Sequence, residues 1–107
     1  MTTFDKREEG FEKKFALDEE QKFKAEVRRN RLLGLWAAEK LGITGDAATA
    51  YAKEVVAADF EEAGHADVLR KVAGDLSKKG VAITEAQIRT KMDELMLQAA
   101  AQVKAGT

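Results

Sequence analysis

The sequence of 107 residues contains no cysteine and no proline. Without cysteine the chain can form neither disulfide bonds nor zinc–thiolate sites, and thiol catalysis is excluded. Without proline, nothing in the sequence forces a break in a long helix. The sequence also lacks a signal peptide and any long apolar run. We therefore expect a cytoplasmic protein that does not insert directly into a membrane.

Neither sign of charge dominates, since 18 Lys and Arg residues face 19 Asp and Glu residues and the formal net charge is −1. This balance argues against a general binder of nucleic acid. Hydrophobic residues make up 45% of the chain and charged residues 35%. Such a composition, at this length, is typical of one globular domain with a strongly ionic surface.

Apolar periodicity and the positions of the glycines predict helices and no strand. The first helix is expected to begin at Asp18, where Gln21 completes a variant of the capping box, and to end at Gly42. A helical wheel places the core-facing side of this helix on Phe23, Val27, Gly34, Ala37, Ala38 and Leu41, with Leu33 and Leu35 at its edges.

Three further helices follow. The second is capped by Thr44 or Asp46 and ends at Gly64, and the third ends at Gly80. The fourth begins at a capping box formed by Thr84 and Gln87. Because the connections are short, neighbouring helices are expected to pack antiparallel or nearly so. The prediction is an all-α fold, a small four-helix bundle over residues 18–104. Its three further apolar stripes are Ala48, Tyr51, Val55 and Ala58; Val68, Leu69, Val72 and Leu76; and Ile88, Met92, Leu95, Ala99 and Val103.

The sequence shows no motif for catalysis. His65 is the only histidine and lies in an expected turn, so we expect it neither to bind a metal nor to act in catalysis. Adjacent acidic pairs such as Glu8 and Glu9 point about 100° apart on a helix, which suits a solvated face. Ser77 has no histidine placed to act as its base. We expect no enzyme activity, no metal and no bound cofactor.

Two local features allow alternative interpretations. The basic run "RRNR" begins with Arg28 and Arg29 and either flanks the first helix in solvent or contacts phosphate or an acidic partner. Trp36, the only tryptophan, either packs in the bundle or contacts a partner. These residues define a possible secondary partner surface.

The N-terminal segment, residues 1–17, has a pattern of its own. Phe4, Phe11 and Phe15 lie within about 40° of one another on a helical wheel, among charged residues. Gly10 lowers the helix propensity of the segment by about 1 kcal/mol. Alone in water the segment is expected to be disordered or only transiently helical.

Binding of this segment to an apolar groove requires more than its phenylalanines. Burial of three phenylalanines contributes roughly 5–9 kcal/mol, whereas ordering the segment costs on the order of 1 kcal/mol or more per residue. Matched ion pairs with a partner must supply the remainder. In the alternative, the three phenylalanines fold back on the bundle. The charged residues available for the ion pairs are Asp5, Lys6, Arg7, Glu8, Glu12, Lys13 and Lys14.

The stretches "FDKREEGFEKKF", "DEE", "RRN" and "LLGLWAAEKLG" occur in this order over residues 4–42. With them the chain closely resembles the zeta subunit family, the ATPase inhibitor of the alphaproteobacterial F-type ATP synthase. The resemblance implies a four-helix bundle with a mobile N-terminal inhibitory segment. It also implies that this segment enters, as a helix, a catalytic interface between alpha and beta subunits near the rotor stalk, where it blocks rotation in the direction of hydrolysis.

Carried onto this sequence, the resemblance implies a protein that is monomeric when free and associates peripherally with the membrane-bound synthase. Weak binding of adenine nucleotide is also implied, at no located site. The remaining hypothesis is a small helical adaptor or nucleotide-binding module that uses the face from Arg28 to Trp36. The implied inhibitory contacts are Phe4, Asp5, Lys6, Arg7, Glu8, Phe11, Glu12, Lys14 and Phe15.

Overall fold

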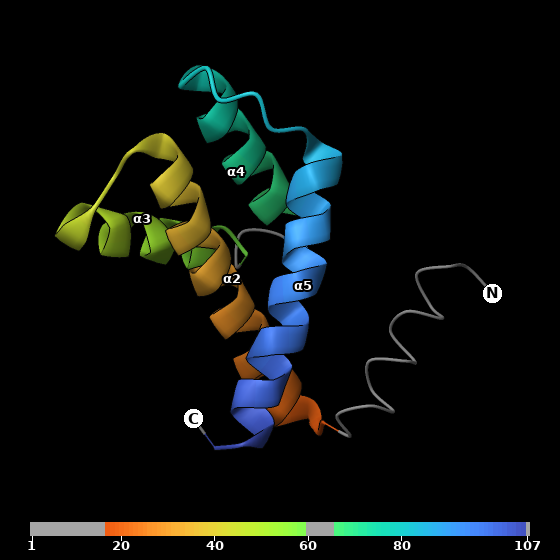
Figure 1. Ribbon diagram of the computed structural model, residues 1–107. Helices are drawn as coiled ribbons and strands as arrows, with labels where there is room; N and C mark the ends of the chain where they lie inside the picture. The colour runs from red at the N-terminus through yellow and green to blue at the C-terminus, as the bar shows by residue number, and fades with distance from the viewer. Residues whose placement is uncertain (1–16, 60–65, 107) are drawn as a thin grey trace.

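The computed structural model describes residues 17–59 and 66–106, and these ranges form four α-helices and no strand (Figure 1). The helices are α2 (Glu19–Leu41), α3 (Gly45–Ala58), α4 (Ala66–Lys78) and α5 (Glu85–Lys104). The predicted all-α class and the small four-helix bundle are therefore confirmed. The expectation for residues 1–16 lies outside the described residues.

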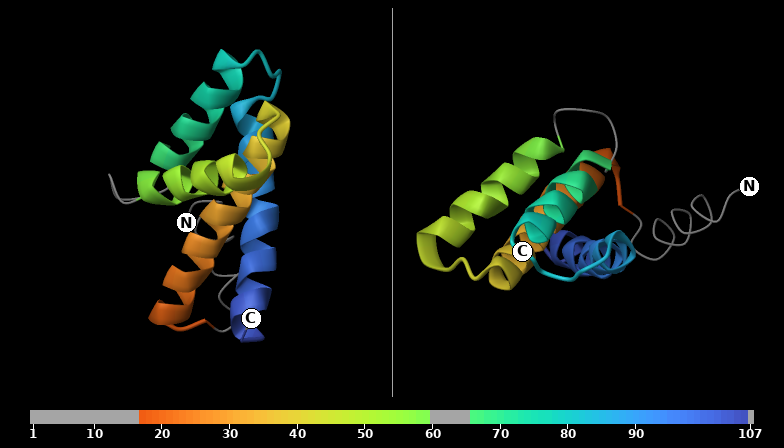
Figure 2. Two further views of the ribbon diagram at one scale, coloured as in Figure 1. Left: turned by 90° about the vertical axis from the view of Figure 1, so that its left-hand side faces the viewer. Right: turned by 90° about the horizontal axis from the view of Figure 1, so that it is seen from above.

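The long helices α2 and α5 lie side by side and run in opposite directions, so that the start of α2 and the end of α5 meet at one end of the molecule (Figures 1 and 2). Helix α4 runs antiparallel to α5, as the short connection between them predicts. Helix α3 differs from the expectation, because it lies across α2 instead of alongside it.

Small residues explain this crossing. A Cβ atom added to Gly34 would lie 2.6 Å from the Cα of Ala52 and 3.3 Å from the Cβ of Val55. The backbones of α2 and α3 thus approach at one point, where neither residue carries a side chain larger than a methyl group. Two helices that approach so closely at one point can cross steeply there without losing contact.

The predicted helix starts are confirmed at atomic detail. The backbone N–H of Gln21 donates to Asp18 Oδ1 at 2.8 Å, and the Asp18 N–H donates back to the Gln21 side chain at 3.2 Å. Thr84 and Gln87 form the same reciprocal pair at 3.1 and 2.8 Å. Each box satisfies backbone donors that the first turn of a helix leaves without a partner.

The predicted helix ends are confirmed where they are described. Gly42 has φ 77° and Gly80 has φ 78°, the left-handed conformation that favours glycine. Thr44 is the N-cap of α3, although its side chain makes no capping hydrogen bond. The end of this helix is an exception: α3 ends at Ala58, whereas the predicted end, Gly64, lies outside the described residues.

The buried face of α2 differs from the predicted one. Phe23, expected in the core, is 54% exposed, whereas Leu33, expected at the edge, is fully buried. The first half of the helix packs on α5, where Ala25 joins Ala99 in one apolar cluster, and the second half packs on α3 near Gly34. Because the two neighbours lie on different sides of α2, the buried face turns along the helix. A single straight stripe therefore mispredicts its first half.

The apolar stripes of the other helices are largely confirmed. All four predicted positions of α4 are buried, and α3 buries its stripe except for the half-buried Ala48. On α5, Leu95 and Val103 are half-buried. The main core lies where α2, α3, α4 and α5 meet, and its fully buried side chains include Leu33, Val55, Val68, Val72, Leu76 and Ile88.

Candidate functional site

The chain enters the bundle at a fixed point next to the N-terminal segment. Leu17 is 9% exposed and packs with Ala25, Ala99 and Ala100 in a small apolar cluster between α2 and α5. Asp18, directly after it, holds the first turn of α2 through the capping box. A segment that leaves the bundle here is anchored on its C-terminal side by a buried leucine and a helix cap.

The implied inhibitory residues lie outside the described residues. They are Phe4, Asp5, Lys6, Arg7, Glu8, Phe11, Glu12, Lys14 and Phe15. The described part of the chain therefore shows the anchor of the segment and the surfaces of the bundle, and the role of these residues stays a prediction. His65 also lies outside the described residues.

The basic run on α2 does not form one surface cluster. Arg29 is only 5% exposed, and its Nε donates to Oδ1 of the fully buried Asn30 at 3.0 Å. Burial lowers the pKa of Arg29, and nearby carboxylates oppose that shift; they belong to Glu26, Asp59 and Asp93. Because these carboxylates come from α2, the end of α3 and α5, the guanidinium is an internal cation where three helices meet. It is not available for a surface contact.

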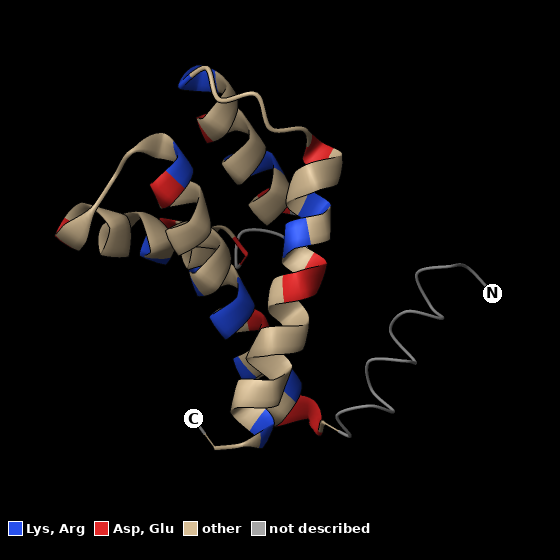
Figure 3. Ribbon diagram, viewed as in Figure 1, with Lys and Arg blue, Asp and Glu red and all other residues tan. Residues whose placement is uncertain are grey.

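Arg28 lies on another side of the helix, and its Nη1 donates to Gln102 Oε1 near the end of α5 at 3.3 Å. Lys24, one turn before Arg28, pairs with Glu20 at 3.2 Å. An open groove of ≈ 570 Å³ begins here, between α2 and the end of α5. Figure 3 shows the basic residues gathered on this part of α2. The residues that line the groove are Gln21, Phe23, Lys24, Val27, Arg28, Arg31, Val103 and Gly106.

Trp36 is half-buried and packs against the main core, in accordance with its packing interpretation. The Nζ atoms of Lys40 and Lys91 lie 6.0 and 5.9 Å from the centre of its ring. These distances allow weak cation–π attraction. Since eight residues of helix separate Trp36 from Arg28 by about 12 Å, the structure does not bring the two into one site.

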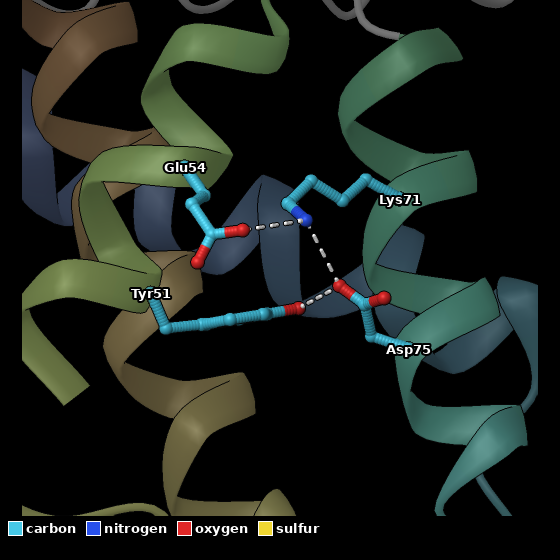
Figure 4. Close-up of polar contacts among 4 residues, drawn as sticks. All are labelled: Tyr51, Glu54, Lys71 and Asp75. Carbon is cyan, nitrogen blue, oxygen red and sulfur yellow. Dashed lines mark hydrogen bonds and ion pairs between the residues drawn. The ribbon is translucent and has the colours of Figure 1, made fainter. Parts of the chain in front are cut away.

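A connected polar cluster joins α3 to α4 (Figure 4). Tyr51 Oη donates to Asp75 Oδ2 at 2.7 Å, and Lys71 Nζ lies 3.1 Å from the same oxygen. Lys71 Nζ also lies 3.5 Å from a Glu54 oxygen and 5.3 Å from the centre of the Tyr51 ring. Burial, followed by the hydrogen bond to Asp75, raises the pKa of Tyr51 well above its usual value of 10.0. The phenol therefore stays protonated near neutral pH and acts as a structural donor.

The sequence did not predict this cluster, because Tyr51 was assigned only to an apolar stripe. Lys71 and Asp75 occupy positions i and i+4 on α4, a spacing that favours an ion pair. The sequence contains this spacing, but it does not show that α3 packs against this part of α4. An open pocket of ≈ 450 Å³ adjoins the cluster; its lining residues are Glu54, Ala57, Ala58, Asp67, Arg70 and Lys71.

Within the described ranges, no group of three histidine, cysteine or acidic residues is placed to hold a metal ion. None of the helices in these ranges is long and apolar enough to span a membrane. The fold places the chain in the class of small all-α bundles.

The comparisons with known proteins make this class specific. A family model described as "ATPase inhibitor subunit zeta" matches residues 1–102. The chain therefore belongs to the ATPase inhibitor subunit zeta family. A structure described as "Solution NMR structure of the protein" is 59% identical, with a TM-score of 0.69, and the match covers 79% of this chain and 96% of that chain. No curated protein matches the chain.

Family membership confirms the resemblance given by the sequence. It makes the chain an inhibitor subunit, which is a regulatory and non-catalytic class of protein, and it implies interaction with the ATP synthase.

Proposed function

We propose that this chain inhibits ATP hydrolysis by the F-type ATP synthase by inserting its N-terminal segment, as a helix, into a catalytic interface between alpha and beta subunits. The inserted helix blocks rotation of the central stalk in the direction of hydrolysis. The observation that carries the proposal is the extent of the family match, which begins at residue 1 and so includes the segment together with the bundle.

The junction at Leu17 supports a division of labour between the two parts. Its burial against α5 and the capping box at Asp18 fix the point at which the segment leaves the bundle. Force on the inserted segment is therefore transmitted to a packed core instead of to a free linker. Because burial of the three phenylalanines does not offset the cost of ordering the segment, its charge pattern selects the partner.

Removal of residues 1–16 tests the proposal. Leu17 is kept, since it belongs to the apolar cluster between α2 and α5. Hydrolysis by the purified ATP synthase head is measured with the full chain, with the truncated chain and with a chain whose residues 1–16 are replaced by a glycine–serine segment of equal length. The full chain should inhibit and the other two should not, while all three keep the same helical circular dichroism. Equal inhibition by all three would refute the proposal.

Single substitutions sharpen the test. Phe11→Ala and Phe15→Ala should each weaken inhibition, because each removes an apolar contact of roughly 1.5–3 kcal/mol with the partner. Leu97→Ala is the matched control, since Leu97 is an apolar side chain on α5 that is 45% exposed. The melting temperature should hardly change in any of the three. A large fall for the phenylalanine variants would show that these side chains pack on the bundle instead.

The alternative, an adaptor or a weak adenine-nucleotide-binding module on the face from Arg28 to Trp36, has less support. Arg29 is buried and therefore does not contribute to this face. Arg28 and Trp36 contact opposite halves of α5, since Arg28 contacts Gln102 and Trp36 contacts Lys91. No observation favours it over inhibition.

A further inference from the structure

The groove between α2 and the end of α5 has a consistent chemistry. Lys24, Arg28 and Arg31 follow one another at positions i, i+4 and i+7, so they form a basic column within about 60° of arc on α2. Phe23 and Val27 form an apolar line beside this column. Val103, at the end of α5, faces the line from the other side of the groove and completes an apolar floor with a basic edge.

Phe23 is the unusual member of this surface. It is 54% exposed, the highest value among the large apolar side chains of the described residues. Large apolar side chains at the edge of a concave, charged surface are typical of protein interfaces. Leu97 is the other large apolar side chain that is exposed within the described ranges, and it lies outside the groove.

No carboxylate lines the groove among the described residues. Glu20 pairs with Lys24 at 3.2 Å, but its side chain is 77% exposed and lies at the rim. Arg31 has no acidic neighbour on its own helix face, where the residues three and four positions away are Val27, Arg28, Gly34 and Leu35. Three basic side chains thus line this groove, although the net charge of the chain is −1.

We infer that this groove is a docking surface for an acidic amphipathic helix on the outside of the ATP synthase head. The basic column pairs with acidic side chains spaced at one helical turn, and the apolar floor takes the neighbouring apolar side chains. The groove lies at the end of the bundle where the chain continues into the inhibitory segment, next to Leu17. A target that holds this segment brings its surrounding surface against the groove.

The inference rests on the proposed function for the identity of the target, and it adds a second, charge-dependent contact. This contact holds the bundle on the head while the N-terminal segment enters or leaves the interface. A tethered segment rebinds from a high effective concentration, so the two contacts together give a slower dissociation than either alone.

The test compares two charge reversals of equal size in the full chain. Lys24→Glu/Arg31→Glu alters the groove, and Lys53→Glu/Lys79→Glu alters exposed lysines elsewhere on the bundle. Binding to the immobilised synthase head is followed by surface plasmon resonance at low and at high salt. We expect the groove variant to dissociate about 10- to 100-fold faster, with unchanged circular dichroism, and the control variant to behave like the parent chain. High salt should remove most of the difference.

An apolar pair of variants tests the floor of the groove. Phe23→Ser should also speed dissociation, whereas Leu97→Ser, at the comparably exposed position on α5, should not. As a probe of the chemistry alone, a labelled helical peptide with glutamates at i, i+4 and i+7 beside leucines should bind the parent chain and lose binding to the groove variant. Equal binding of the peptide to the groove variant and to the control would overturn the inference.

The outcomes separate this inference from the proposed function. If removal of residues 1–16 abolishes inhibition but the groove and control variants dissociate alike, the inference fails and the proposed function stands. If the chain without these residues still binds the head in a groove-dependent way, and the full chain does not inhibit, only the proposed function fails. Groove-dependent binding to phosphatidylglycerol vesicles, or groove-dependent self-association in sedimentation, without binding to the head, would also overturn the inference.

Discussion

Replacement of Gly34 by alanine tests the crossing of α2 and α3 that shapes the bundle. The new Cβ would lie 2.6 Å from the Cα of Ala52, a backbone atom that cannot turn aside. To reach an ordinary contact distance, the helices must separate by roughly 1 Å at a point where the core is tightly packed. Overpacking of this kind costs about 1–3 kcal/mol, and it exceeds the gain of up to about 1 kcal/mol that alanine brings to a helix interior.

Gly74 on α4 is the matched control, because nothing lies within 4 Å of a Cβ added there. Gly74→Ala should therefore stabilise the protein by about 0.5–1 kcal/mol, while Gly34→Ala should destabilise it by up to about 2 kcal/mol. At roughly 4–8 °C per kcal/mol for a domain of this size, the two melting temperatures should move in opposite directions. Thermal unfolding followed by circular dichroism measures both. A stabilising Gly34→Ala would refute the close approach of the two helices.

Three further changes test the polar contacts, each by urea unfolding. Tyr51→Phe removes the hydrogen bond to Asp75 and should cost about 1–3 kcal/mol, because the acceptor is charged. The pKa of Tyr51 is higher in the folded protein than in the unfolded chain, so the contribution of Tyr51 to stability is complete below pH 10.0 and is lost as the pH rises through the raised pKa. In a pH titration, the phenolate absorbance of the only tyrosine should therefore appear at higher pH in the folded protein than in the urea-unfolded chain. Asp18→Ala should cost about 1 kcal/mol and Asp18→Asn much less, since asparagine can still cap. Arg29→Ala should cost about 1–3 kcal/mol, because it leaves Oδ1 of the buried Asn30 without its donor.

Local signals in the sequence predicted what is determined locally. The capping boxes at Asp18 and Thr84 and the glycine stops at Gly42 and Gly80 depend only on residues within one turn of one another. The stripe of α4 was also predicted in full, because this helix buries one face. Each of these features follows from the backbone hydrogen-bonding needs of a helix end or from a period of 3.6 residues.

Features that depend on the arrangement of the helices were not predictable in the same way. The helical wheel assumes that α2 packs against the rest of the fold on one side only. It therefore places Phe23 in the core and Arg29 at the surface, whereas Phe23 is exposed and Arg29 is buried. To predict the crossing at Gly34, one must know that Ala52 lies opposite it, and no local sequence pattern contains that information. Arg29 is tolerated inside because carboxylates on three helices surround it, and that compensation exists only in the assembled bundle.

The wrong prediction for Phe23 bears on the candidate site. A phenylalanine that local periodicity assigns to a core face, and that the fold leaves 54% exposed, lies beside a column of basic side chains. The buried contacts of α2 are made by other residues, Ala25 and Leu33 among them. A side chain this exposed contributes little buried apolar area to the fold. Phe23→Ser should accordingly leave the free energy of unfolding within about 0.5 kcal/mol of the parent chain, and a larger loss in urea unfolding would assign the ring to the stability of the bundle instead of to its binding surface.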